Sequence, residues 1–427
     1  MRGPSPRVAL STPACPRQFR QPDINVEAHM RDIPHDSSTA CPTTGDVFGY
    51  ASEQIHRAAA EMWPRVPVLL GNHIPSVTGY VHQLQVGDRP MYAKHSMLGG
   101  SLVSVLTGEY GTWEAVAKRQ AAYVDAPDSL LAREAKQLAF LASDGKPRAC
   151  AVIGLRRGVL FTEPVPGPAL SALMLTSPAE AGHLLVRAWS ELVPLHSRNF
   201  PGEEIAERSI AGTFRRKFNG LSGETYLGRL GVARLSEETS AEVIALIRPL
   251  VLRLHRVPLG PTAAEDKVLV YGDLKPEHIV FPDGPDKAPY FIDPGLMRAA
   301  PSVDAAKLIS RTTLSLAASG ASAAAAKDIA LGIQEFVRTL LGNADHLRRD
   351  AMLRRLLLLW CMDTINIMTT YLSAPSAVPL PVQGRRLAED PLPVLRLVNA
   401  ASDLLTTRSE STAAWERALD GVSGVGA

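Results

Sequence analysis

The segment that most constrains the fold carries two acidic residues on either side of a short turn. The chain reads YGDLKPEHIVF from Tyr271 to Phe281 and YFIDPGL from Tyr290 to Leu296, with the turn PDGPDKAP between them. β-Branched residues around a turn rich in Pro, Gly and Asp predict a β-hairpin. Asp273 precedes its first strand and Asp293 follows its second, so both carboxylates should meet at one edge. Such a pair can hold Mg²⁺ and orient a hydroxyl for phosphoryl transfer, or it can simply cap turns.

This stretch resembles the catalytic loop of the aminoglycoside phosphotransferase and choline kinase group of the protein-kinase-like superfamily. That group has the pattern His-Gly-Asp-x-x-x-x-Asn followed by a metal-binding aspartate, and Gly272, Asp273 and Asp293 match it in type and order. The resemblance implies that Asp273 is the catalytic base or hydroxyl-orienting residue and that Asp293 is the principal metal ligand. It also implies that Asp304 braces the catalytic loop, and that ATP and Mg²⁺ are the nucleotide and the cofactor.

Three positions depart from the group's pattern. Tyr271 stands where the group usually has His, His278 where it has Asn, and Pro294 where an aromatic residue usually follows the metal-binding aspartate. Imidazole can ligate a cation, but Mg²⁺ prefers oxygen ligands. His278 is therefore expected either as a metal ligand in place of Asn or as the donor of a structural hydrogen bond.

A phosphotransferase also needs a cation on the nucleotide phosphates, held by a carboxylate on a helix. Lys94 lies in the apolar stretch MYAKHSML, where a lysine is otherwise unfavourable, and Glu134 lies in LAREAKQLAFLA. The second stretch resembles the partner helix of the group, which implies that Lys94 and Glu134 form this pair. Alternatively, Lys94 reaches the surface and Glu134 pairs with Arg133 or Lys136 in solvent.

Two further segments are candidates for nucleotide contact. The loop from Gly71 to Val81 carries small residues, including Ser76, whose backbone could cover phosphates, although it could equally be an ordinary hairpin turn. The stretch from Val159 to Met174 resembles the inter-lobe hinge of the group. The backbone of Glu163 and Val165 would then meet adenine, unless this stretch is only a proline-rich linker.

The chain as a whole predicts an α+β, bilobal, protein-kinase-like fold with a small β-rich N-lobe and a larger helical C-lobe. Period-two patterns alternate with helices in the first part, and long helical patterns dominate the second. We predict a disordered N-terminal segment over residues 1–44, an N-lobe over 45–165, a C-lobe with the catalytic loop over 166–372, and a Pro-rich tail with one helix over 373–427.

Composition favours a soluble cytoplasmic protein. The apolar fraction is 46% and the formal charge is +2, which does not suggest a nucleic-acid binder. The four cysteines lie far apart and form no CxxC pair, so neither a disulfide framework nor a zinc site is expected. Prolines interrupt the N-terminus, and the Ala-rich stretch at 317–326 is too short to span a membrane.

The acceptor is expected to contact the inserted region 197–261 and the helices over 324–372. Basic clusters there favour an acidic or peptide acceptor, or they are solvated helix faces. Their members are Arg215, Arg216, Lys217, Arg348, Arg349, Arg354 and Arg355. The expected activity is ATP-dependent transfer of the γ-phosphate to a hydroxyl of a small molecule. A loose similarity to kinase-like proteins of ribosomal peptide biosynthesis adds Ser/Thr of a precursor peptide.

Two other functions remain open. The departures at Tyr271, His278 and Pro294 allow a nucleotide-binding pseudokinase that acts as a scaffold. The chain could also be a subunit of a peptide-modifying complex that is active only with its partner. ATP binding without turnover would indicate the first of these, and a stable partner would indicate the second.

Overall fold

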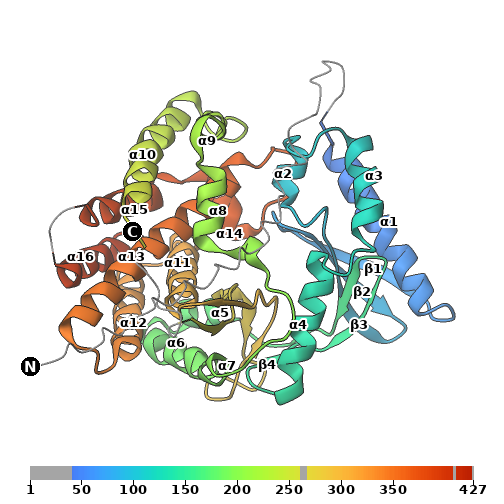
Figure 1. Cartoon of the computed structure of the whole chain (residues 1–427), viewed down its shortest axis with the longest axis horizontal. Helices are drawn as coiled ribbons and strands as arrows, with labels where there is room; N and C mark the ends of the chain where they lie inside the picture. Colours follow the sequence, from blue (N-terminus) through green and yellow to red (C-terminus); the bar gives the residue numbers. More distant parts are fainter. Residues whose placement is uncertain (1–40, 260–266, 407–409, 426–427) are drawn as a thin grey trace, which may run out of the picture. The chain divides into compact units, whose positions relative to one another are not determined.

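The computed structural model describes residues 41–259, 267–406 and 410–425, and Figure 1 shows their arrangement. Most of the segment predicted to be disordered, residues 1–44, lies outside the described residues. The first helix, α1, covers Thr44–Met62. Thr43 caps it: its hydroxyl accepts the Asp46 N–H at 3.1 Å, and the Asp46 carboxylate accepts the Thr43 N–H at 2.9 Å. This reciprocal capping box satisfies two backbone donors that the start of a helix leaves unpaired.

A five-stranded antiparallel sheet forms the β-rich part, with strand order β1-β2-β3-β6-β5. The strands are β1 (Val68–Ile74), β2 (Tyr80–Val86), β3 (Arg89–His95), β5 (Val152–Arg156) and β6 (Val159–Thr162). Successive side chains of a strand point to opposite faces. On β6, Phe161 accordingly packs in the cluster with Ile55 of α1, whereas Leu160 packs with Leu138 of α4 (Leu130–Asp144). Helices α1 and α4 therefore cover opposite faces of the sheet.

Two short helices follow β3 and form a small core of their own. They are α2 (Leu102–Leu106) and α3 (Trp113–Tyr123). Leu102 and Val116 are buried in the same cluster as Val378, which lies far along the chain, beyond the longest helix. The C-terminal part of the chain thus packs directly against this pair of helices.

One small sheet contains the hairpin that the sequence predicts, and a second pairs the strands that precede and follow it in sequence. β8 (Ile279–Val280) pairs antiparallel with β9 (Tyr290–Phe291), which confirms the hairpin, and β9 pairs in parallel with β4 (Arg148–Ala149). β7 (Val268–Val270) pairs antiparallel with β10 (Met297–Ala299). The backbone around the predicted catalytic loop is therefore fixed by strands on both sides.

The rest of the described chain is helical and surrounds a single large core. Helix α11 lies against α13, and nearly every side chain of α11 is buried, including Leu308 and Leu314. The helices are α5 (Leu170–Thr176), α6 (Ala181–Ser190), α7 (Val193–His196), α8 (Ile210–Lys217), α9 (Gly220–Leu227), α10 (Glu237–Arg256), α11 (Ser302–Ser319), α12 (Ala323–Leu341), α13 (His346–Ser373), α14 (Val382–Glu389), α15 (Leu392–Leu404) and α16 (Ser411–Ser423). Three short 3₁₀ turns are η2 (Pro178–Glu180), η3 (Ala206–Arg208) and η5 (Pro276–His278). A β-rich N-terminal part and a larger helical C-terminal part make this an α+β fold, as the sequence predicts.

The Pro-rich tail differs from the prediction of one helix over 373–427. It contains α14, α15 and α16, and the side chains of all three enter the large core. The rings of Trp360 on α13 and Trp415 on α16 meet edge to face at 5.6 Å. Helices α14, α15 and α16 are thus part of the helical body.

One described helix is long and apolar enough to cross a membrane by length and composition. It is α13, and 89% of its most apolar window is buried inside the fold. Buried windows of this kind are typical of the core helix of a soluble protein, and α13 has that position here.

Candidate active site

A single buried carboxylate shapes the predicted catalytic loop. Asp304, in the first turn of α11, accepts the Tyr271 N–H at 2.6 Å and the Gly272 N–H at 2.7 Å. Gly272 has φ of +77°, and a Cβ there would lie 1.9 Å from the carbonyl oxygen of Gly295. Only glycine fits so close an approach with this backbone. Asp304 thus occupies the position that the family resemblance implies for it, where it braces the predicted catalytic loop.

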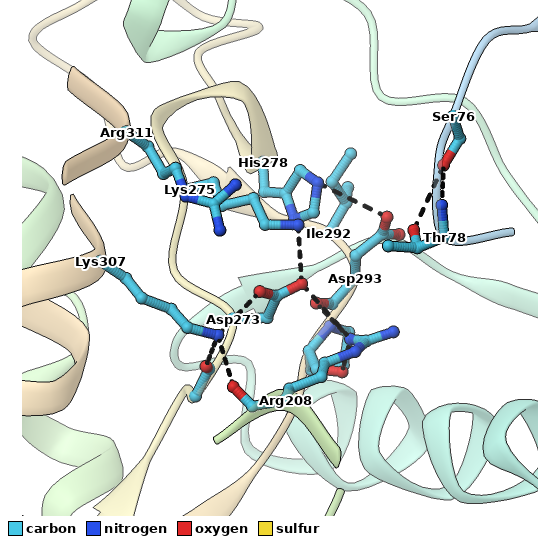
Figure 2. Close-up of polar contacts among 12 residues, drawn as sticks. Ser76, Thr78, Arg208, Asp273, Lys275, His278, Ile292, Asp293, Lys307 and Arg311 are labelled. Carbon is cyan, nitrogen blue, oxygen red and sulfur yellow. Dashed lines mark hydrogen bonds and ion pairs between the residues drawn. The ribbon is translucent and has the colours of Figure 1, made fainter. Parts of the chain in front are cut away.

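Three cations converge on the carboxylate of Asp273. Lys275 Nζ lies 2.9 Å from Oδ2, Lys307 Nζ lies 3.0 Å from Oδ1, and Arg208 Nη1 lies 3.8 Å from Oδ2. Figure 2 shows these side chains reaching Asp273 from different sides. Burial raises the pKa of Asp273, but the charges of Lys275, Lys307 and Arg208 outweigh it and hold the pKa well below its ordinary value. Asp273 is therefore ionised throughout the neutral range.

Asp293 follows the hairpin in a strained conformation that points its carboxylate at two predicted site residues. Its φ is +58°, which is uncommon for a residue other than glycine. One carboxylate oxygen contacts Lys94 Nζ, and the other lies 3.6 Å from His278 Nε2. Strained backbone of this kind clusters at functional sites, so the conformation motivates a functional role.

Lys94 and Glu134 meet as the sequence predicts. Lys94 lies on β3 next to Leu160 of β6, on the face that α4 covers, and its Nζ is 2.9 Å from Glu134 Oε1. The Glu134 side chain is only 1% exposed. Its burial raises the pKa, but Lys94 and Arg208 lower it to below the ordinary value. The alternative, a solvent pairing of Glu134 with Arg133 or Lys136, does not occur: Arg133 bonds to Glu207 instead.

His278 is a neutral ring in this environment. Burial lowers its pKa well below the ordinary value, and the charge of Lys275 adds to that effect. Its Nδ1 is buried without a hydrogen-bond partner. The contact with Asp293 is therefore no ion pair at neutral pH, and the imidazole would offer a cation a nitrogen, whereas Mg²⁺ prefers oxygen ligands.

The donor set around the hairpin fits one divalent cation better than two. Asp293 offers oxygen ligands on a side chain that is 27% exposed, whereas both oxygens of Asp273 are bonded to lysines. Within residues 41–259, 267–406 and 410–425, no group of three or more His, Cys, Asp or Glu gathers as a metal site. Asp293 would thus hold one divalent cation, and the nitrogen of His278 does not fit as a second Mg²⁺ ligand.

The other residues predicted to contact the nucleotide lie in the loop between β1 and β2 and in the linker after β6. In the β1–β2 loop, Ser76 Oγ accepts the N–H groups of Thr78 and Gly79 at 3.2 and 3.4 Å, and Figure 2 draws this loop beside Asp293. Glu163 lies just after β6, where its N–H donates to Ala151 O at 3.0 Å and its carboxylate pairs with Arg89. Val165, two residues on, packs against the apolar cluster beneath α4.

Three charged residues of the centre were not among the predicted site residues. Lys275 lies inside the motif itself, two residues after Asp273, so the motif contained the signal. Lys307 lies one helical turn after Asp304 and also donates to the carbonyl of Gly272 at 2.6 Å. Arg208 lies in the inserted region, and no local pattern distinguishes it.

Comparisons with known proteins identify the family of the chain. A family model described as the phosphotransferase enzyme family (APH) matches residues 101–350. No curated protein matches the chain. Among solved structures, the aminoglycoside-3'-phosphotransferase of type VIII is 22% identical, with a TM-score of 0.41 over 73% of this chain and 99% of that chain. The choline kinase from Cryptosporidium parvum Iowa II is 10% identical, with a TM-score of 0.42 over 86% and 100%.

A third solved structure is the spectinomycin phosphotransferase in complex with ADP and spectinomycin. It is 13% identical, with a TM-score of 0.43 over 79% of this chain and 93% of that chain. These scores are low, so the family assignment rests on the family model, which spans more than half of the chain and includes Glu134, Asp273 and Asp293. The chain belongs to the phosphotransferase enzyme family (APH).

Proposed function

We propose that the chain is an ATP-dependent phosphotransferase that moves the γ-phosphate to a hydroxyl group. The observation that supports this most is that Lys94 of β3 contacts both Glu134 of α4 and Asp293 after the hairpin. Arg208 links Glu134 in turn to Asp273. Phosphoryl transfer needs little covalent chemistry from the protein. It needs charge neutralisation and positioning, which such a set provides.

The proposed reaction uses the carboxylate of Asp273 on the acceptor. The acceptor oxygen attacks the γ-phosphorus, the bond to the β-phosphate oxygen breaks, ADP leaves, and the hydroxyl proton passes through Asp273 to solvent. Because three cations keep the pKa of Asp273 low, Asp273 is a weak base. Its contribution is to accept a hydrogen bond that aims the hydroxyl, and to take the proton late, as a loose transition state allows.

The remaining residues would hold the nucleotide. Lys94, oriented by Glu134, would contact the phosphates, and Asp293 would ligate a divalent cation, which supplies neutralisation of charge on the transferred group. Since the Glu163 N–H is bonded to Ala151, its carbonyl and the N–H of Val165 are the groups proposed for adenine. A phosphate under the β1–β2 loop would replace the Ser76 hydroxyl as acceptor of the Thr78 and Gly79 amides.

The direct test is ATP turnover against a panel of hydroxyl acceptors. We expect ADP release and phosphorylated product with the native chain, and loss of both in Asp273→Ala with folding retained. Turnover that survives in Asp273→Ala would contradict the proposal.

A nucleotide-binding pseudokinase is the second candidate, favoured by the neutral imidazole of His278 at the position of a metal-ligating amide. It predicts thermal stabilisation by ATP without turnover on any acceptor, and a Lys94→Met variant that loses the stabilisation. Detection of phosphorylated product would remove this candidate.

The acceptor class is proposed to be a small-molecule hydroxyl or the Ser/Thr of a precursor peptide. Arg215 and Arg216 are exposed on α8, which favours an acidic or peptide acceptor. Lys217 is instead turned inward, donating to the Asn366 carbonyl at 2.6 Å. A serine peptide rich in acidic residues should then accept phosphate better than the same peptide with lysines in their place. The reverse preference would exclude the acidic-peptide acceptor.

A further inference from the structure

A short segment joins the nucleotide side of the centre to the helix that begins the acceptor region. It covers residues 203–209 and leads directly into α8. On one side it is tied to α4, where Arg133 Nη1 donates to Glu204 O at 2.8 Å and Gln137 Nε2 donates to Glu203 O at 3.1 Å. On the other side it is tied to the loop after Asp293, where the Ile205 N–H donates to Leu296 O at 3.2 Å.

One side chain in this segment contacts three parts of the centre at once. Arg208 Nη2 donates to Glu134 Oε2 at 2.8 Å, and its Nη1 donates to the carbonyls of Asp293 at 3.0 Å and Pro294 at 2.5 Å. The same Nη1 lies 3.8 Å from Asp273 Oδ2. Figure 2 shows the guanidinium below Asp273 and Asp293.

The backbone of Arg208 is anchored as well. Its carbonyl accepts a hydrogen bond from Lys307 Nζ at 2.8 Å, and the same ammonium bonds to Asp273 Oδ1 at 3.0 Å. Main chain and side chain therefore meet the centre from two directions. Any displacement of α8 must either carry Arg208 with it or break these bonds.

The charge at Glu134 requires a second cation. The Glu134 carboxylate is 1% exposed, and Lys94 is shared between it and Asp293. A buried carboxylate is costly unless each oxygen has a partner. Arg208 supplies the partner for Oε2, and the planar fork of arginine lets one group bond to Glu134 and to two carbonyls in a fixed geometry. A lysine ammonium could not hold that geometry as rigidly.

We propose that Arg208 is a positioning residue for phosphoryl transfer, which fixes Glu134, and with it Lys94, relative to the Asp293 loop and Asp273. The proposal rests on the proposed function. Arg208 touches neither substrate in it, and acts through the residues that do. Through segment 203–209, the start of the acceptor region and the phosphate-binding centre would move as one unit.

The test compares Arg208→Met and Arg208→Lys with a matched control, Arg133→Met. The Arg133 side chain ties the same segment to α4 by bonding to Glu204 O and Glu207, and not to Glu134, Asp273 or Asp293. If Arg208 positions the centre, Arg208→Met should lower kcat roughly 100-fold with a much smaller change in the KM for ATP. Arg208→Lys should recover part of that loss, and Arg133→Met should lower the melting temperature while kcat stays within a few-fold.

If Arg208→Met and Arg133→Met lower kcat equally at matched melting temperatures, Arg208 contributes only to the stability of the fold. Amide hydrogen exchange provides a readout that needs no turnover. Arg208→Met should reduce protection both in α4 around Glu134 and in residues 292–296, whereas Arg133→Met should leave 292–296 unchanged. Unchanged protection there in Arg208→Met would overturn the inference, and absent turnover in the native chain would overturn the proposed function alone.

Discussion

At the scale of single residues, two aspartates of the centre differ in pKa because their surroundings differ. Asp273 is surrounded by Lys275, Lys307 and Arg208, so its pKa lies well below the ordinary value. Burial raises the pKa of Asp304 to about 6, although the N–H groups of Gly272 and Tyr271 oppose that rise. Asp273 lies in the loop and Asp304 lies on α11 beneath it, and of the two only Asp304 changes charge near neutral pH.

We therefore expect the acid limb of kcat to follow Asp304. Protonation of one Asp304 oxygen weakens the hydrogen bond that this oxygen accepts from the backbone of Tyr271 or Gly272. We therefore expect kcat to fall as pH drops through about 6, roughly tenfold per unit well below it. Stability should change in the opposite sense. The folded pKa exceeds the ordinary value of 3.8, so the folding free energy that Asp304 contributes is full below 3.8 and is lost as pH rises through about 6.

A pH profile of kcat, paired with melting temperatures at each pH, checks both signs. Asp304→Asn serves as the control because its amide does not titrate, so its lower activity should be flat across this range. If kcat of the native chain stays constant down to pH 4, Asp304 does not control the loop.

His278 can be tested by restoring the residue type of the family. In His278→Asn an amide oxygen replaces a neutral ring nitrogen, and Mg²⁺ prefers oxygen. We expect half-maximal activity at a Mg²⁺ concentration roughly ten times lower than in the native chain. His278→Ala is the control, since it removes the ring without adding an oxygen and should leave the Mg²⁺ requirement unchanged or higher. An unchanged requirement in His278→Asn would mean that position 278 does not face the cation.

At the scale of elements, the catalytic loop depends on the close passage of two backbone segments. Gly295 N–H donates to Tyr271 O at 2.9 Å, and Gly272 leaves no room for a Cβ beside Gly295. The hairpin β8–β9 sets the separation of Asp273 and Asp293 along the chain. The directions of their carboxylates depend instead on the contact between the backbone at Tyr271 and Gly272 and the backbone at Gly295.

Gly272→Ala should therefore abolish activity and lower stability by more than a left-handed conformation alone would cost. Gly320→Ala provides the comparison, since Gly320 has φ of +68° at the end of α11 and no atom within 4 Å of its Cβ position. That variant should cost about 1 kcal/mol with normal kcat. The test measures the free energy of unfolding in urea and kcat for both variants. Equal losses of stability would show that the loop moves aside to accept a methyl group.

The sequence predicted the elements that have local signals. A period-two pattern gave β2, the turn gave the hairpin, and the apolar surroundings of Lys94 indicated its inward position. The one helix predicted in the tail agrees with α15, whose first turn contains Pro393, but the prediction missed α14 and α16. The other prolines suggested irregular chain, whereas Pro381 is the N-cap of α14. Arg208 could not be found, because its partners Glu134 and Asp293 are distant in sequence and meet it only in the fold.

At the scale of the whole molecule, the part of the chain after α13 joins two groups of elements. Arg234 Nη2 donates to the carbonyls of Pro375 at 2.7 Å and Val378 at 3.1 Å, which fixes this stretch to the helical body. Val378 then packs with Leu102 and Val116 of the α2–α3 pair. The β-rich and helical parts are thus joined by apolar packing in addition to the contact of Lys94 with Asp293.

The last prediction follows from that packing. The Val378 side chain is 2% exposed, so Val378→Ala removes two buried methyl groups and should lower the free energy of unfolding by about 2 kcal/mol. Val382→Ala is the matched control, because Val382 is 59% exposed and should change stability by less than about 0.5 kcal/mol. If the two parts unfold together, amide hydrogen exchange of α3 and far-ultraviolet ellipticity, both followed through a urea titration, will give one shifted transition. An early transition confined to the α2–α3 region would show instead that Val378 stabilises that region alone.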